Sequence, residues 1–390
     1  MLARTRTSIY PRLGLSLRAA STMVTRPADW KSRAPAPLPN TKTKTGEVQV
    51  NCVTLYNKDR TVVYGTDDGV YLQPQNGPTR KAFDLAGVQQ VDVLEDLSLL
   101  VVRAERSVLT FPLDELETEQ PVEHTRRITL ASQTSFFKTG MCMSRMMICI
   151  VKTASLSSTF KVLKSSRSPT PESNQRGRTS SPDDNKLKPF KEFYIARESY
   201  LVQFLKSKLC VVAASGFEIV DFETLNTQAL LDPVDQRLAF VRRVGPRPLR
   251  MYRIGGEFLV CYREFAFYVD SSGKKSERDV VIHWEGTPST CGKYFQITQR
   301  IRLIAVLALH YPYIIAFSPN FVEIRHVDDG SLVQIILESD VRCLYAKGSL
   351  AEDLAYHLSR QREKNVLVSH ANRVTFLTPN MTRADRRHSK

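Results

Sequence analysis

The chain has 390 residues, of which 42% are hydrophobic, and a formal net charge of +15. This length can hold one large domain or two ordinary ones, with a sizeable core. No window reaches the roughly 18–20 apolar residues of a membrane-spanning helix, because the best one, 301–317, contains Arg302, His310 and Pro312. The basic balance favours an acidic partner, but the lack of RNP, zinc-finger and basic-helix patterns argues against nucleic acid.

Residues 1–46 are predicted to form a disordered basic arm. Five arginines precede the first acidic residue, Asp29: Arg4, Arg6, Arg12, Arg18 and Arg26. This composition is also typical of a mitochondrial presequence, and Met23 offers an alternative start. We therefore expect an arm outside the folded domain, with mitochondrial import as the alternative interpretation.

A hairpin pattern recurs along the rest of the chain. In KLCVVAASGFEIVDFETL (208–225) an apolar run, a tight turn and an alternating run indicate a β-hairpin with one buried strand. The hairpins predicted in this way are Thr61–Pro74, Leu99–Leu116, Met146–Lys164, Lys208–Leu225, Phe258–Lys275, Tyr313–Gly330 and Asn365–Asn380. Further strand-like stretches precede several of them, at 88–96, 248–256 and 339–346.

Seven such units predict an all-β fold, a seven-bladed β-propeller over residues 47–383. A unit of three or more short antiparallel strands cannot bury both faces alone, whereas copies stacked around an axis can. Blade repeats run to about 40–50 residues, and the region has room for seven. A β-sandwich is the structural alternative, but it would not require seven similar hairpins. The strand-like stretches that precede the hairpins are expected to be the innermost strands.

Residues 165–189 do not fit a blade. They lack apolar periodicity and are rich in Ser, Pro and charge, so a disordered loop between blades is predicted. Ser168, Thr170 and Ser181 each precede a proline and are candidate sites for proline-directed phosphorylation.

The seven cysteines lack zinc-site spacing, and a disulfide framework would be unusual in a chain of this length. Cys149, Cys210 and Cys261 fall at similar places in the first strand of their hairpins. We expect buried, reduced thiols where neighbouring blades pack.

Several of these segments together resemble the citron homology (CNH) domain, in the version found at the C-terminus of fungal Rho-family guanine-nucleotide exchange factors. They include TVVYGTDDGVYL, GFEIVDFETLNTQALLDP, FLVCYREFAFYV, LALHYPYIIAF and FVEIRHVDDGSLVQII, and the resemblance covers about 48–346 in order. It implies a propeller-like interaction module in Rho GTPase signalling, which in fungi is linked to cell-wall integrity and polarised growth.

The chain departs from that pattern in two ways. About fifty residues precede the CNH region, too few for the Dbl-homology and pleckstrin-homology domains of those factors, so we expect no exchange activity and a fragment or truncated relative. An atypical insert at about 291–306 separates WEGTP from LALHYPY. A retained intron in the gene is one hypothesis for it; a loop or added strand outside the blade is the other.

No catalytic, cofactor-binding or metal-binding residues are predicted. Gly286, Gly292 and Lys293 lack phosphate-loop spacing, and no nucleophile elbow or HExxH pair occurs. The acidic pairs before Gly69 and Gly330 suit turns. His283, His310 and His326 are interpreted as structural.

Two hypotheses of function follow from these residues. The favoured one is a non-catalytic interaction propeller that binds a Rho-family GTPase or another signalling protein; the alternative is a propeller enzyme, such as a hydrolase, with carboxylates lining its channel. A basic inter-blade loop, with Arg242, Arg243, Arg247 and Arg250, is the candidate surface for an acidic partner or an anionic membrane. The expected location is the cytoplasm, including the inner face of the plasma membrane.

Overall fold

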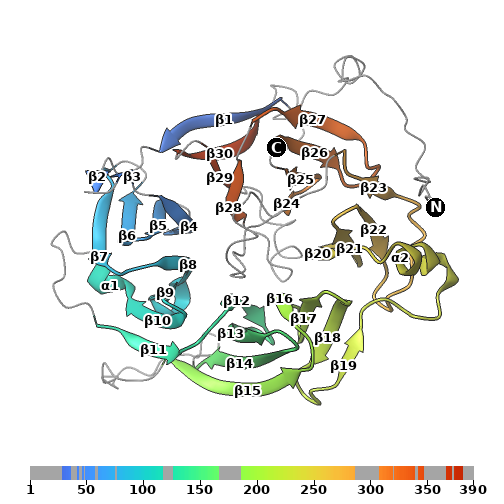
Figure 1. The fold of residues 1–390 in the computed structure, drawn as a ribbon, viewed down its shortest axis with the longest axis horizontal. Helices are drawn as coiled ribbons and strands as arrows, with labels where there is room; N and C mark the ends of the chain where they lie inside the picture. The colour runs from blue at the N-terminus through green and yellow to red at the C-terminus, as the bar shows by residue number, and fades with distance from the viewer. Residues whose placement is uncertain are drawn as a thin grey trace, which may run out of the picture.

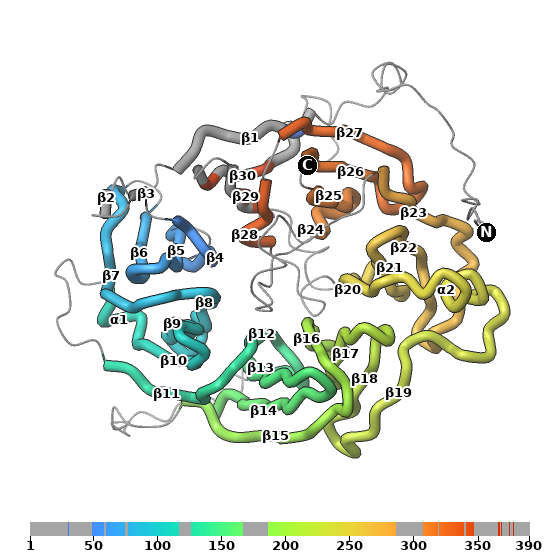
Figure 2. Tube along the Cα trace, viewed as in Figure 1, coloured from blue at the N-terminus to red at the C-terminus, as the bar shows by residue number. Residues whose placement is uncertain are grey.

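The computed structural model describes residues 29–36, 42–43, 46–47, 49–57, 60–74, 77–116, 126–166, 186–285, 307–318, 320–338, 341–346, 366–370 and 373–380. Within these ranges almost all of the regular secondary structure is β-strand, and seven four-stranded antiparallel sheets surround a common axis (Figure 1). Each sheet is called a blade below. The chain passes from blade to blade around the ring in one direction (Figure 2). The predicted all-β, propeller-like fold is confirmed; the number of blades in the complete chain stays a prediction.

Each blade is built in the same order from the axis outward. The innermost strands are β4 (Val50–Tyr56), β8 (Val88–Leu94), β12 (Phe136–Cys142), β16 (Ser199–Phe204), β20 (Pro248–Ile254), β24 (Leu307–His310) and β28 (Arg342–Ala346). The second strands are β5 (Thr61–Thr66), β9 (Leu99–Ala104), β13 (Arg145–Ala154), β17 (Lys208–Ala213), β21 (Glu257–Tyr262), β25 (Tyr313–Phe317) and β29 (Val366–His370).

The third strands are β6 (Gly69–Pro74), β10 (Ser107–Pro112), β14 (Ser157–Ser165), β18 (Gly216–Asp221), β22 (Phe265–Val269), β26 (Val322–His326) and β30 (Arg373–Asn380). The outermost strands are β7 (Arg80–Asp84), β11 (Ile128–Ala131), β15 (Leu187–Ile195), β19 (Thr227–Ala229), β23 (Val281–His283), β27 (Leu332–Ile336) and β1 (Asp29–Ala36). The second and third strands are the hairpins expected from the sequence.

The remaining described elements are short. They are the helices α1 (Leu113–Leu116) and α2 (Ala239–Val244), the 3-10 turns η2 (Glu95–Leu97) and η3 (Gln236–Leu238), and the strand pair β2 (Lys42–Thr43) and β3 (Gly46–Glu47).

The core lies between the blades. Hydrophobic clusters occupy each junction of neighbouring blades around the ring. One of these junctions lies between the β4–β7 blade and the blade formed by β28, β29, β30 and β1. Strand residues point alternately to the two faces of a sheet, so a blade between two neighbours buries both sets. This explains the nearly continuous burial of β5 and β17.

The predicted cysteine positions are confirmed. Cys149, Cys210 and Cys261 lie on second strands, are fully buried, and are free thiols. Burial raises the pKa of the Cys210 thiol to about 12, so it stays protonated at neutral pH.

One prediction about the arm is wrong. Residues 29–36 were expected to be disordered, yet they form β1, the outermost strand of the last blade (Figure 1). Asp29 is paired with Asn380 and Arg33 with Phe376. The sequence did not predict this strand, because its partner strand lies at the other end of the chain and its own residues lack apolar alternation. Residues 42–43 and 46–47 also form short strands, whereas 1–28 lie outside the described residues.

The predicted disordered loop 165–189 is also too long. Strand β14 ends at Ser165, and β15 begins at Leu187. Leu187 is 5% exposed and packs in the cluster between the β8–β11 and β12–β15 blades. The sequence did not predict the start of β15, because lysines and a proline surround Leu187. Residues 167–185 lie outside the described residues.

A buried ionic cluster connects the β20–β23 blade to the next one. Glu323 on β26 is 1% exposed, accepts a hydrogen bond from the backbone N–H of Glu285 at 2.9 Å, and pairs with the Arg325 guanidinium. Arg325 also donates to the Gly330 carbonyl at 2.9 Å and reaches the Glu285 carboxylate at 3.1 Å. Burial raises the pKa of Glu323 above its ordinary value, despite the opposing effect of Arg325.

Candidate interaction surface

An insertion between β19 and β20, residues 230–247, fills the outer space between two blades. Leu230, Leu238 and Val241 are buried in the cluster that joins these blades. The Phe240 ring lies 5.5 Å from that of Phe265 and 5.2 Å from that of Phe267. Blades diverge toward the outside of a propeller, so such a gap needs additional apolar side chains. We call residues 230–247 the wedge.

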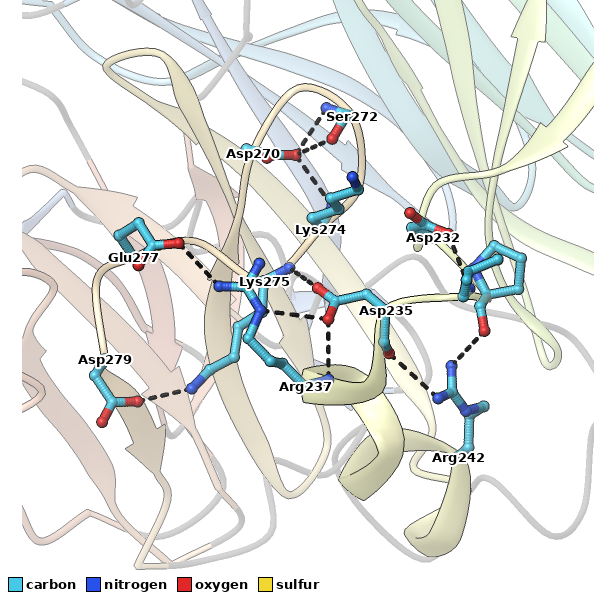
Figure 3. A network of polar contacts seen from close by, with 12 residues as sticks. Asp232, Asp235, Arg237, Arg242, Asp270, Ser272, Lys274, Lys275, Glu277 and Asp279 are labelled. Carbon is cyan, nitrogen blue, oxygen red and sulfur yellow. Dashed lines mark hydrogen bonds and ion pairs between the residues drawn. The ribbon is translucent and has the colours of Figure 1, made fainter.

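A polar network fixes the wedge to the β22–β23 loop (Figure 3). The Asp235 carboxylate accepts hydrogen bonds from the backbone N–H groups of Arg237 and Lys275, both at 2.9 Å. Arg237 lies between this carboxylate, at 3.3 Å, and Glu277, at 3.0 Å. Desolvation raises the pKa of Asp235, but the hydrogen bonds and Arg237 outweigh it and hold the pKa below its ordinary value.

The β22–β23 loop approaches the wedge at a glycine. Gly273 has φ +86°, and its carbonyl accepts a hydrogen bond from the backbone N–H of Asp232 at 2.9 Å. A Cβ atom at this position would lie 1.9 Å from the Leu230 carbonyl oxygen. The Asp270 side chain shapes the loop by accepting from the backbone N–H groups of Ser272 and Lys274, at 2.8 and 3.0 Å.

Gly273→Ala should therefore detach the loop from the wedge. We expect a loss of more than about 1 kcal/mol in the free energy of unfolding, because the left-handed backbone and the close approach both exclude a side chain. Urea unfolding followed by circular dichroism measures this. Gly256→Ala is the matched control, since a Cβ there meets nothing within 4 Å. Equal stability of the two variants would contradict the described packing.

The four predicted surface arginines do not form one patch. Arg242 and Arg243 are exposed on α2, which replaces the predicted loop. Arg242 donates to the carbonyls of Pro233 and Asp235 at 2.9 and 3.2 Å. Arg247 lies 5.4 Å from the centroid of the Tyr200 ring.

Arg250 is separate from the other three. It lies on the innermost strand β20 and donates to the Leu307 carbonyl of the next blade at 3.4 Å. It also stacks over Tyr252, with 5.5 Å from guanidinium carbon to ring centroid. The sequence placed it with the others because it is near them along the chain, but the turn into β20 carries it toward the axis.

Two apolar side chains beside the arginines were not predicted. Val234 is 76% exposed and Val244 is 52% exposed. Together with Arg242 and Arg243 they define what we call the wedge surface. The only sequence signal for Val234 is its place between Pro233 and Asp235, in a segment without periodicity.

The other predicted residues have local roles or lie outside the described residues. His310 packs edge-on against Trp30 at 5.0 Å, and His326 Nδ1 accepts from the backbone N–H of Asp328 at 3.3 Å. Gly330 has φ +70°, as the turn interpretation requires, whereas Gly69 lies in β6 without a positive φ. Ser168, Thr170, Ser181 and the 291–306 insert are not among the described residues.

The innermost strands bear on the enzyme hypothesis. Within their described residues, the seven innermost strands contain one carboxylate, that of Asp92. It accepts hydrogen bonds from Thr54 on β4, at 3.4 Å, and from Thr139 on β12. It ties three blades together at the axis. Within the described residues, no group of three or more His, Cys, Asp or Glu side chains could hold a metal ion, and no helix could cross a membrane.

This architecture defines a β-propeller with an exposed wedge between two blades. The family model of the CNH domain matches residues 58–347. The chain belongs to the CNH-domain family.

Similar proteins agree with this assignment. The chain is 35% identical over 309 residues to "Rho1 guanine nucleotide exchange factor 1" of Schizosaccharomyces pombe, covering 77% of this chain and 22% of that protein. It is 33% identical over 300 residues to "Rho1 guanine nucleotide exchange factor 2" of the same organism, covering 75% of this chain and 24% of that protein. The chain thus spans about a quarter or less of these relatives. The solved AfRom2 CNH domain is 31% identical, with a TM-score of 0.69 over 91% of this chain and 99% of that one.

Proposed function

We propose that this chain is a non-catalytic protein-interaction propeller in Rho-family GTPase signalling. The observation that carries the proposal is that its similarity to two Rho1 exchange factors falls within about a quarter of their length, and that the CNH model matches 58–347 of this chain. The described helices contain four and six residues. We expect the propeller to supply binding surfaces for partner proteins. We assign the exchange reaction to other parts of such factors.

The proposed partner is a Rho-family GTPase or another signalling protein with an acidic surface. It would act in the cytoplasm, at or near the inner face of the plasma membrane. The wedge surface is the proposed docking site, because exposed Arg243 lies beside Val244 and an apolar centre with charged neighbours suits protein recognition.

Capture of purified Rho-family GTPases by the immobilised full chain tests this function. We expect saturable binding without vesicles, and no acceleration of nucleotide release from the bound GTPase. Failure to bind any nucleotide state of these GTPases, or accelerated release, would contradict the proposal.

Charge reversal at the wedge surface tests the docking site. Arg243→Glu should weaken capture of the GTPase at least about fivefold, as expected for an interface arginine worth more than about 1 kcal/mol, with no change in unfolding. Arg242→Glu should weaken capture and also stability, because that guanidinium holds two wedge carbonyls. Lys152→Glu, an exposed change on another blade, is the control. Equal effects of Lys152→Glu and Arg243→Glu would reject the wedge surface.

A further inference from the structure

Five basic residues lie at one end of the β12–β15 blade and in the adjacent β16–β17 turn. They come from distant points of the chain: Arg145, Lys164, Lys186, Lys188 and Lys206. We call them the basic cluster. Lys164 on β14 is the direct cross-strand partner of Lys188 on β15. One residue further along, the backbone N–H of Ser166 donates to the Lys186 carbonyl at 3.0 Å.

The two remaining members join the cluster through neighbouring turns. Arg145 donates to the Ser165 carbonyl, the last residue of β14, at 3.3 Å. The backbone N–H of Met143 donates to the Lys206 carbonyl at 2.8 Å, which brings the β16–β17 turn of the next blade alongside. The cluster therefore spans the ends of two adjacent blades.

The basic cluster has no acidic partner within the part of the chain that the structure describes. Among the described residues, none of the five forms a salt bridge. Lys186 donates to the Leu97 carbonyl at 2.8 Å, and the Lys164 ammonium lies 4.6 Å from the centroid of the Phe190 ring. Nearby Lys208, by contrast, pairs with Asp221 at 3.4 Å.

The arrangement is unfavourable for the isolated propeller. Like charges directly opposite each other on neighbouring strands repel, and Lys164 and Lys188 are such a pair. Glu95 and Asp96, which precede the Leu97 carbonyl that Lys186 contacts, are exposed acids of the neighbouring blade, and neither forms a salt bridge with Lys186 among the described residues. An external anion would relieve the repulsion.

We propose that the basic cluster is a contact site for an anionic lipid bilayer. Four of its five members are lysines, which act as point charges toward many phosphates, whereas a pocket for a single phosphate favours the arginine fork. Lys186, Lys188 and Lys206 are exposed at the blade ends, and Met143 beside them is 39% exposed and can enter the headgroup region. The proposal adds a membrane contact to the proposed function. It rests on that function in one respect, namely that the chain acts near a membrane.

Vesicle co-sedimentation of the full chain tests the proposal. We expect binding to phosphatidylcholine vesicles that contain phosphatidylserine, no binding to pure phosphatidylcholine, and weakening as salt rises. Because one lysine near an anionic membrane contributes about fivefold in affinity, the variant Lys164→Gln/Lys186→Gln/Lys188→Gln/Lys206→Gln should lose at least about tenfold.

The matched control removes the same charge elsewhere: Arg106→Gln/Arg127→Gln/Lys152→Gln/Lys274→Gln, all exposed residues. It should bind within about twofold of the wild type, a change smaller than one lysine at the surface. Equal losses in the two variants would overturn the proposal, since net charge would then explain binding. So would absent binding of the wild type, or capture of a phosphorylated peptide of residues 167–185 without vesicle binding. GTPase capture without vesicles should be unchanged in the four-lysine variant, so failure of this proposal is separate from failure of the proposed function.

Discussion

Trp30→Ala is expected to destabilise the propeller by about 3–5 kcal/mol, the cost typical of deleting a buried tryptophan. Trp30 is 2% exposed and lies in the cluster between the last two blades. Its ring packs edge-on against His310 at 5.0 Å and Tyr313 at 5.7 Å. Its backbone N–H donates to the Gln334 side chain at 2.8 Å, and that side chain donates back to the Trp30 carbonyl at 3.3 Å.

The large effect follows from the place of β1 in the ring. β1 is the outermost strand of the last blade, and the N-terminal segment that forms it is anchored by Trp30. Losing that anchor leaves a cavity and releases the strand that covers β30. The free energy of unfolding, from urea titrations followed by circular dichroism, measures the loss.

Three further variants test whether the loss of stability comes from removing the Trp30 side chain and its contacts. Trp30→Phe should cost less than Trp30→Ala, because the indole N–H is buried and finds no hydrogen-bond partner among the described residues. Gln334→Ala should cost about 1 kcal/mol for each hydrogen bond it loses. Val234→Ala, at a side chain that is 76% exposed, should stay within about 0.5 kcal/mol of the wild type. If Trp30→Ala behaved like Val234→Ala, β1 would not hold the ring closed.

The sequence was most informative where structure is local. Each hairpin carries its own signal, because an apolar strand, a turn and an alternating strand are adjacent in the chain. For the same reason the turn roles of Asp329 and Gly330 could be predicted: Asp329 accepts from the Ser331 backbone N–H at 2.9 Å. The resemblance to a CNH domain added the family and the expectation of an interaction module.

Structure that depends on distant residues could not be predicted. Strand β1 lies beside residues 374–380, and Leu187 is an anchor only because the β8–β11 blade lies against it. The location of the basic surfaces could not be predicted for the same reason. Arg250 follows Arg247 closely in sequence but reaches the next blade, whereas Lys164, Lys188 and Lys206 meet only in the fold.

Arg325→Met should destabilise the propeller by about 3–5 kcal/mol, because it leaves the buried Glu323 carboxylate without its compensating charge. Glu323→Gln/Arg325→Met should recover most of this loss, since the unpaired charge is then gone. Glu285→Gln should cost less than about 1 kcal/mol, because the Glu285 side chain is 62% exposed. Urea titrations of the three variants measure these differences.

The pH dependence gives the sharper test. Burial raises the pKa of Glu323 above its ordinary value of 4.5, so the folded protein binds this proton more tightly than the unfolded chain. The stability that this proton contributes is complete below 4.5 and is lost as pH rises through the folded pKa. Without Arg325, ionising Glu323 becomes costlier still, and the difference between Arg325→Met and wild type should shrink as the pH is lowered toward 4.5. A difference independent of pH would mean that the buried charge of Glu323 is not what Arg325 compensates.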